Sequence, residues 1–128
     1  MDAVTIIILI GVVVAFFYLK KLKNSKNMIP PQKFKELLQE GPGDIIDVRT
    51  RNEYNNGHLK KTDYNYDMSS SDFDENIEKL DKEKNYFLYC RTGARSGRAT
   101  QMMKRKGFEN VYNIGGIQSL VNAGFEKE

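Results

Sequence analysis

The residues best suited to chemistry lie in one short segment, Tyr89–Arg98 (YCRTGARSGR), which contains the single cysteine of the chain, Cys90. A cysteine reacts as its thiolate, and positive charge or free backbone N–H groups beside the sulfur favour that form. Between Cys90 and Gly107 there are six basic residues and no acidic ones. The segment therefore predicts a reactive thiol. The alternative is a small buried residue followed by a solvated basic helix.

The residues after the cysteine offer either a hydrogen-bond donor or a positive charge. If the chain turned tightly from a strand into a helix here, the free N–H groups of the loop and of the first helical turn would face the sulfur. A glycine permits such a turn where a side chain would resist it, and a hydroxyl can donate to an anionic sulfur or cap the helix. The candidate binding residues are Arg91, Thr92, Gly93, Ala94, Arg95 and Ser96.

The spacing of Cys90 and Arg95 indicates which anion the loop would hold. Four residues separate them, whereas cysteine phosphatases, which hold a tetrahedral phosphate, have five. The smaller ring suits a sulfur atom bonded to the cysteine better than it suits phosphate. Phosphatase or arsenate reductase chemistry remains as an alternative.

Strands and helices are expected to alternate along the chain. Strands are predicted at 44–48, 85–89 and 111–114, helices at 31–40, 74–80, 96–106 and 117–122, a helical turn at 51–56, and irregular or edge structure at 63–74. This order predicts an α/β domain with a mostly parallel central sheet and helices on both faces. Cys90 directly follows a predicted strand, and sites in such folds form beyond the carboxyl ends of the strands.

Three segments together resemble the single-domain rhodanese-like sulfurtransferases. They are Asp44–Leu59 (DIIDVRTRNEYNNGHL), Tyr89–Ala99 (YCRTGARSGRA) and Gly107–Gly116 (GFENVYNIGG), in the family's order and at its distances. The resemblance runs from about Met28 to Phe125 and implies a rhodanese-like domain over residues 29–128. It also implies that Cys90 accepts a sulfane sulfur, that the N–H groups of residues 91–95 hold the persulfide, and that Arg91 and Arg95 attract anionic donors.

The resemblance further assigns supporting roles to four residues outside the loop. Asp47 would order the loop, and Arg49 would pair with Glu53. His58 lies in the family's Gly-His turn, where structural hydrogen bonds are a better reading than a general base. The chain departs from the family at Leu120, where tryptophan is common, and in the polar segment 60–66.

The implied reaction moves sulfur from a small-molecule donor, such as thiosulfate or a persulfide, to a thiol or cyanide acceptor, with thioredoxin or glutathione as further candidates. It needs no metal and no cofactor. The alternative is a non-enzymatic, membrane-tethered rhodanese-like module that binds a partner or carries sulfur.

The N-terminal quarter differs from the rest of the chain. Ala3–Leu19 carries no charge, and as a helix it would be roughly 25 Å long, near the lower limit for crossing a bilayer. We expect a transmembrane anchor at 1–21 and a polar linker at 22–28, because the features of a cleaved signal peptide are missing. The lysines that follow predict a single-pass membrane protein whose catalytic domain faces the cytoplasm.

Charge and cysteine content limit the other functional classes. Residues 1–26 hold four lysines and one aspartate, and the rest of the chain holds sixteen basic and sixteen acidic residues. The basic excess is therefore confined to the expected membrane edge, where it suits anionic lipids, and it does not predict nucleic-acid binding. A single cysteine excludes an intrachain disulfide and fits a reducing compartment.

Overall fold

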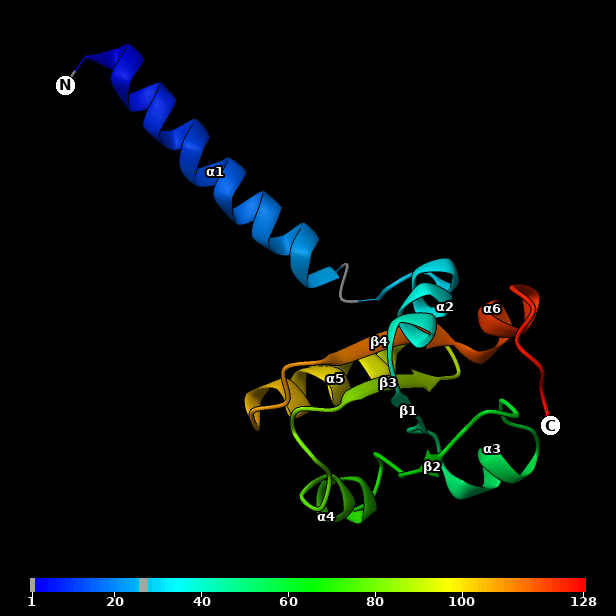
Figure 1. Cartoon of the computed structure of the whole chain (residues 1–128). Coiled ribbons are helices and arrows are strands. Elements are labelled where there is room, and N and C mark those ends of the chain that lie inside the picture. The colour runs from blue at the N-terminus through cyan, green and yellow to red at the C-terminus, as the bar shows by residue number, and fades with distance from the viewer. Residues whose placement is uncertain (1, 26–27) are drawn as a thin grey trace.

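The computed structural model describes residues 2–25 and 28–128, apart from the side chains of residues 20–25. The elements are α1 (Ala3–Ser25), α2 (Pro31–Glu40), β1 (Gly43–Asp47), α3 (Arg51–Asn55), β2 (Tyr64–Asn65), α4 (Asp72–Ile77), β3 (Asn85–Cys90), α5 (Ala94–Arg105), β4 (Val111–Gly116) and α6 (Ile117–Asn122). Strands and helices alternate after α2, as the sequence predicts (Figure 1).

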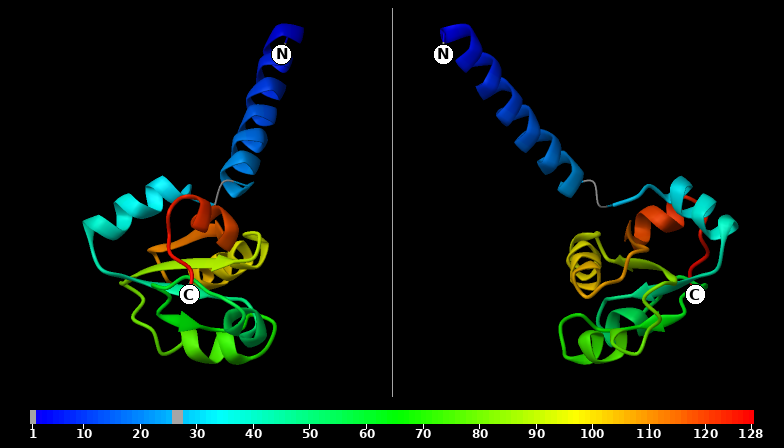
Figure 2. Two further views of the ribbon diagram at one scale, coloured as in Figure 1. Left: turned by 90° about the vertical axis from the view of Figure 1, so that its right-hand side faces the viewer. Right: turned by 60° about the vertical axis from the view of Figure 1, so that its left-hand side comes forward.

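The four strands form one parallel sheet in the order β2-β1-β3-β4. The sheet lies between two layers of helices (Figures 1 and 2). The strand β3 is internal, and its last residue, Cys90, pairs with Gly116 of β4. The predicted α/β architecture with a parallel sheet is confirmed, and Cys90 lies at the carboxyl edge of that sheet.

Alternation along β3 divides the core into two parts, since successive side chains of a strand point to opposite faces. Tyr86, Leu88 and Cys90 face the layer that contains α4 and α5, whereas Phe87 and Tyr89 face α2 and α6. The first core consists of Ile46, Val48, Phe73, Ile77, Tyr86, Leu88, Cys90, Ala99, Met103, Phe108 and Val111. The second consists of Phe34, Ile45, Leu59, Phe87, Tyr89, Ile114, Ile117 and Leu120.

Two element boundaries near Cys90 differ from the prediction. The helix α5 begins at Ala94 rather than at Ser96, because the chain turns at Gly93, whose φ is 97°. The strand β4 continues beyond Ile114, because Gly115 and Gly116 pair with the end of β3. The first turn of α5 thus begins four residues after Cys90, and the end of β4 lies beside Cys90.

The N-terminal segment forms the helix α1, whose described apolar side chains are largely exposed; Ile7, for example, is 68% exposed. Among the described residues, none of the helices combines the length and the apolar character needed to cross a bilayer. The predicted transmembrane anchor at 1–21 is therefore not supported. The predicted linker at 22–28 includes residues 26 and 27, which lie outside the described residues.

Candidate active site

The turn after β3 is built on a glycine that no other residue could replace without strain. Gly93 has a φ of 97°, a left-handed conformation that L side chains rarely adopt. A Cβ atom at this position would clash with Cε of Met28 and lie 3.3 Å from Cα of Gly115. The backbone can therefore fold tightly over the end of β3, with the N–H group of Gly93 facing back toward Cys90.

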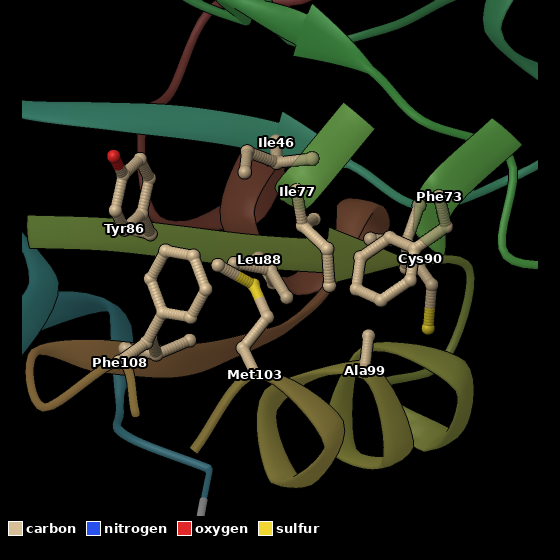
Figure 3. Packing of buried hydrophobic residues seen from close by; sticks show 11 residues of the cluster. Ile46, Phe73, Ile77, Tyr86, Leu88, Cys90, Ala99, Met103 and Phe108 are labelled. Carbon is tan, nitrogen blue, oxygen red and sulfur yellow. The ribbon is translucent and has the colours of Figure 1, made fainter. Parts of the chain in front are cut away.

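Two donors contact the sulfur of Cys90. The N–H of Gly93 lies 3.0 Å from Sγ, and the hydroxyl of Ser96 lies 3.3 Å from it. Cys90 itself is fully buried. Figure 3 shows it at the end of the first core, near Phe73, with its sulfur directed toward Ala99 of α5. The sulfur thus has apolar neighbours on one side and hydrogen-bond donors on the other.

These surroundings act on the thiol in opposite directions. Burial raises the pKa of Cys90, because a thiolate is poorly solvated in the core. Hydrogen bonds from the Ser96 hydroxyl and from the backbone N–H groups of Ser96, Gly93 and Thr92 stabilise the thiolate, and together they leave the pKa of Cys90 below its usual value. The pKa is lowered by these hydrogen bonds, and the contribution expected from the basic residues of the loop stays a prediction.

The last arginine of the loop is paired with a carboxylate from another element. Arg95 donates two hydrogen bonds to Glu53 of α3, of 2.7 and 2.9 Å. Glu53 also closes a capping box with Thr50 at the start of α3. The hydrogen bonds from Arg95 lower the pKa of Glu53 to about 2. The positive charge of Arg95 is thus largely compensated within the protein.

The predicted pair of Arg49 with Glu53 is wrong. Arg49 instead turns back to Asp47, with a shortest contact of 2.7 Å between Nη2 and Oδ2, and it also donates to the carbonyl of Gly57 at 2.7 Å. Asp47 additionally accepts a hydrogen bond of 2.9 Å from the backbone N–H of Arg49. The side chains of this pair are almost fully buried. Asp47 thus orders the loop after β1 and not the turn after Cys90.

The side chains of the remaining predicted residues make no hydrogen bond to the sulfur, although the backbone N–H of Thr92 contributes to its surroundings. Arg91, Thr92 and Ala94 are exposed, and the Thr92 hydroxyl accepts a hydrogen bond from the N–H of Ala94 at 3.5 Å. His58 stacks on Tyr54, with ring centroids 3.8 Å apart, and its Nδ1 lies 3.0 Å from the carbonyl of Tyr54. Its contacts are those of a structural residue.

Two buried asparagines at this edge of the sheet were not singled out from the sequence. Asn65 donates to the carbonyls of Asp47 and Arg49, at 3.1 and 2.9 Å. Asn113 contacts both Ser96 and Gly93. Asn113 lies two residues before the glycine pair, and this position could have marked it as a residue near the site. The polar segment around Asn65 contains no comparable signal. Within the described part of the chain, no group of three or more His, Cys, Asp or Glu side chains is arranged to hold a metal.

The family model of the rhodanese-like domain matches residues 30–123 of the chain. The chain belongs to the rhodanese-like family. Among solved structures, this rhodanese-like domain is similar to a rhodanese-like domain protein from Staphylococcus aureus, at 26% identity and a TM-score of 0.63 over 77% of this chain and 95% of that one. It is also similar to a structure described as rhodanese with anions from E. coli, at 26% identity and a TM-score of 0.59 over 68% of this chain and 98% of that one.

A curated relative carries a different name. The chain is 34% identical over 109 residues to the tRNA uridine(34) hydroxylase of Pelagibacter ubique. The aligned region covers 83% of this chain and 36% of the relative. The chain therefore spans about a third of the length of that relative. The similarity concerns the rhodanese-like portion, and the activity of the whole relative does not follow from it.

Proposed function

We propose that the protein is a sulfurtransferase that carries a sulfane sulfur on Cys90. The observation that carries the proposal is the pair of donors at Sγ, from Gly93 at 3.0 Å and Ser96 at 3.3 Å, within a loop of the size predicted for a persulfide. Donors placed in advance around a buried sulfur stabilise negative charge there without further reorganisation. The same donors would serve the thiolate before the reaction and the persulfide anion after it.

The reaction proceeds in two nucleophilic steps. The Cys90 thiolate attacks the outer sulfur of thiosulfate; an S–S bond forms, and sulfite leaves with the electron pair of the bond that breaks. The product on the protein is a Cys90 persulfide anion. A thiolate or cyanide then attacks the terminal sulfur and releases the Cys90 thiolate, so that no proton or electron has to be supplied from elsewhere.

The burial of Cys90 favours a small donor. The residue has an exposed fraction of 0%, so a bulky donor could not reach the sulfur without opening the loop. Since the charge of Arg95 is compensated by Glu53, exposed Arg91 is the loop residue best placed to attract an anion. Thiosulfate and low-molecular-weight persulfides fit both conditions. Glutathione meets the same size condition as an acceptor, whereas thioredoxin, being a protein, would reach the sulfur only when the loop opens.

The test is turnover of thiosulfate with cyanide or glutathione, measured for the wild type and for Cys90→Ala. We expect turnover in the wild type alone. Lys33→Ala is the control, because Lys33 is exposed on α2, outside the loop. Equal turnover by wild type and Cys90→Ala would overturn the proposal.

The wild type and Cys90→Ala also test the two alternative functions, a phosphatase and a binding module. Hydrolysis of p-nitrophenyl phosphate that requires Cys90 would favour the phosphatase alternative. A cellular phenotype that Cys90→Ala rescues fully would favour a binding module. We do not expect phosphatase activity, because only four residues separate Cys90 and Arg95. We do not expect a binding module, because the donors at Sγ would have no purpose in a module that only binds a partner.

The name of the relatives makes tRNA a second candidate substrate, since the chain is 34% identical to one tRNA uridine(34) hydroxylase. The charge balance argues against it, because residues 27–128 carry equal numbers of acidic and basic residues and nucleic-acid binding depends on basic surfaces. Electrophoretic mobility shifts with total tRNA at low salt would decide. Salt-sensitive binding would revive this candidate.

Membrane attachment, with the catalytic domain on the cytoplasmic side, stays a prediction from the sequence. It rests on the apolar run Ala3–Leu19 and the lysines that follow it. Fractionation of the full chain, with Val12→Lys and Phe16→Lys as disrupting variants and Lys33→Ala as control, tests the attachment. Wild type and lysine variants in the same fraction would overturn it.

A further inference from the structure

A single buried side chain connects the two groups that donate to Cys90. Asn113 of β4 is 3% exposed. Its Nδ2 donates to the carbonyl of Gly93 at 3.0 Å, and its Oδ1 lies 2.7 Å from the hydroxyl of Ser96. Oδ1 also accepts a hydrogen bond from the N–H of Gly115 at 3.0 Å. The amide therefore joins the turn, the first turn of α5 and the glycine pair.

The backbone partners determine how this amide is oriented. The carbonyl of Gly93 can only accept and the N–H of Gly115 can only donate, so Nδ2 and Oδ1 cannot exchange places without the loss of both hydrogen bonds. Oδ1 is then an acceptor, and Ser96 is the donor in their contact. The orientation of Asn113 thus follows from two groups that are part of the main chain.

We propose that Asn113 is a positioning residue for the chemistry at Cys90: its amide restrains the turn at Gly93 so that the Gly93 N–H faces Sγ, and it keeps the Ser96 hydroxyl beside Sγ while the sulfur is neutral. The inference rests on the proposed function, and it adds a residue from a strand outside the loop. The N–H of Gly93 can point at the sulfur only while the turn at Gly93 is kept in place, and the hydrogen bond from Asn113 to the Gly93 carbonyl restrains that turn.

The Ser96 hydroxyl has one proton and two acceptors within reach. It can donate to Oδ1 of Asn113, at 2.7 Å, or to Sγ of Cys90, at 3.3 Å. When the sulfur is neutral, the shorter contact to Asn113 is favoured. When the sulfur becomes a thiolate or a persulfide anion, the proton turns to it, because hydrogen bonds to charged groups are the stronger ones. Oδ1 then keeps its hydrogen bond from Gly115. The Ser96 oxygen has to move away from Oδ1 at the same time, because two oxygens with no proton between them repel at 2.7 Å.

Gly97 provides the space for this arrangement. A Cβ atom at Gly97 would lie 3.2 Å from Nδ2 of Asn113, which is close enough to displace the amide. Gly97 lies within α5, where alanine is a better helix former than glycine. Gly97→Ala should therefore stabilise the helix and at the same time displace the amide of Asn113. A slower reaction in this variant would then reflect a change at the site and not a loss of folding.

The experiment measures the rate of Cys90 alkylation by iodoacetamide as a function of pH, because only the thiolate reacts. The proteins are the wild type, Asn113→Leu, Gly97→Ala and, as a control, Asn122→Leu, whose side chain is exposed on α6. Circular dichroism and thermal unfolding check that each protein is folded. Arg95 is the charged group that also interacts with the sulfur, because its guanidinium is stabilised by a Cys90 thiolate.

At pH 7 we expect Asn113→Leu to react roughly ten-fold more slowly than the wild type, because a donor to a charged sulfur is misplaced. Its pH profile moves to higher pH. Gly97→Ala changes in the same direction by a smaller amount, and Asn122→Leu matches the wild type. If Asn113 acts through Ser96, the Ser96→Ala and Asn113→Leu effects are not additive in the double variant.

Folded Asn113→Leu and Gly97→Ala proteins with the pH profile of the wild type would overturn the inference, even if Asn113→Leu were less stable. Additive effects in the double variant would overturn the coupling to Ser96. These results do not depend on sulfur transfer. A wild type that forms no persulfide refutes the proposed function and leaves the alkylation result standing, whereas unchanged alkylation refutes only the role of Asn113.

Discussion

The guanidinium of Arg95 donates two hydrogen bonds, of 2.7 and 2.9 Å, to the carboxylate of Glu53. This contact ties the first turn of α5 to α3. It holds the helix that supplies Ser96, and it compensates a charge that would otherwise face incoming anions. The pair therefore affects both stability and the attraction of donors.

Removal of the carboxylate should weaken the fold in a pH-dependent way. Because the pKa of Glu53 is lowered from 4.5 to about 2 in the folded protein, its contribution is complete above its unfolded pKa and is lost as the pH falls toward 2. We expect Glu53→Gln to lower the free energy of unfolding by about 1 kcal/mol at pH 7, and the difference from wild type to shrink below pH 4.5. Urea unfolding at several pH values measures it.

The control for this prediction is Glu78→Gln. Glu78 is 71% exposed and lies 3.9 Å from Lys106, so its replacement should leave the pH dependence of unfolding unchanged. A constant difference between Glu53→Gln and wild type from pH 7 to pH 3 would contradict the assigned pair.

The buried pair of Asp47 and Arg49 should matter far more for stability. Asp47→Ala leaves the guanidinium of Arg49 buried without its carboxylate, which costs about 3–5 kcal/mol in such sites. Denaturant unfolding measures the loss. Glu36→Ala, which removes an exposed partner 3.9 Å from Lys33, should change the free energy of unfolding by less than about 0.5 kcal/mol. Similar losses in the two variants would mean that the Asp47–Arg49 pair is unimportant.

The Ser96 hydroxyl should set the pH at which Cys90 becomes reactive. Its hydrogen bond helps to keep the pKa of Cys90 low, so Ser96→Ala should raise that pKa and move the alkylation profile to higher pH. Ser119→Ala, on the exposed face of α6, is the matched control and should leave the profile in place. A profile of Ser96→Ala that coincides with that of the wild type would contradict a role of the hydroxyl in lowering the pKa of Cys90.

Gly93→Ala should distort the turn for two separable reasons. The new Cβ meets Cε of Met28, and alanine is strained at a φ of 97°, which costs about 1–2 kcal/mol. The double variant Gly93→Ala/Met28→Ala removes the contact with Met28 but keeps the strain and the 3.3 Å approach to Cα of Gly115, so it should recover part of the lost stability and little of the sulfur transfer. Full recovery of turnover would show that the left-handed turn is not needed.

The turn after β3 was predictable because its signals are local. A strand-forming run, a cysteine, a glycine and a helix-forming segment follow one another within Tyr89–Arg98, and each has a preferred backbone conformation. The order of strands and helices follows in the same way. Even here the start of α5 lies two residues before the predicted one, because the left-handed Gly93 ends the turn early.

The pairs around the turn were not predictable, because they form between segments distant in the chain. Glu53 lies close to Arg49 in sequence, yet the loop after β1 folds Arg49 back onto Asp47, which leaves Glu53 free for Arg95. Asn113 reads as an ordinary polar residue of a strand. Its role depends on the packing of α5 against β4, and that packing brings Ser96 and Gly93 to its amide.

The mass of the protein after treatment with thiosulfate tests the central claim most directly. The account predicts that the intact wild type gains the mass of one sulfur atom, that a thiol or cyanide removes it, and that Cys90→Ala never gains it. Peptide mapping should place the added sulfur on Cys90. A wild type that gains no mass with thiosulfate or any low-molecular-weight persulfide, although its thiol is free, would contradict the account.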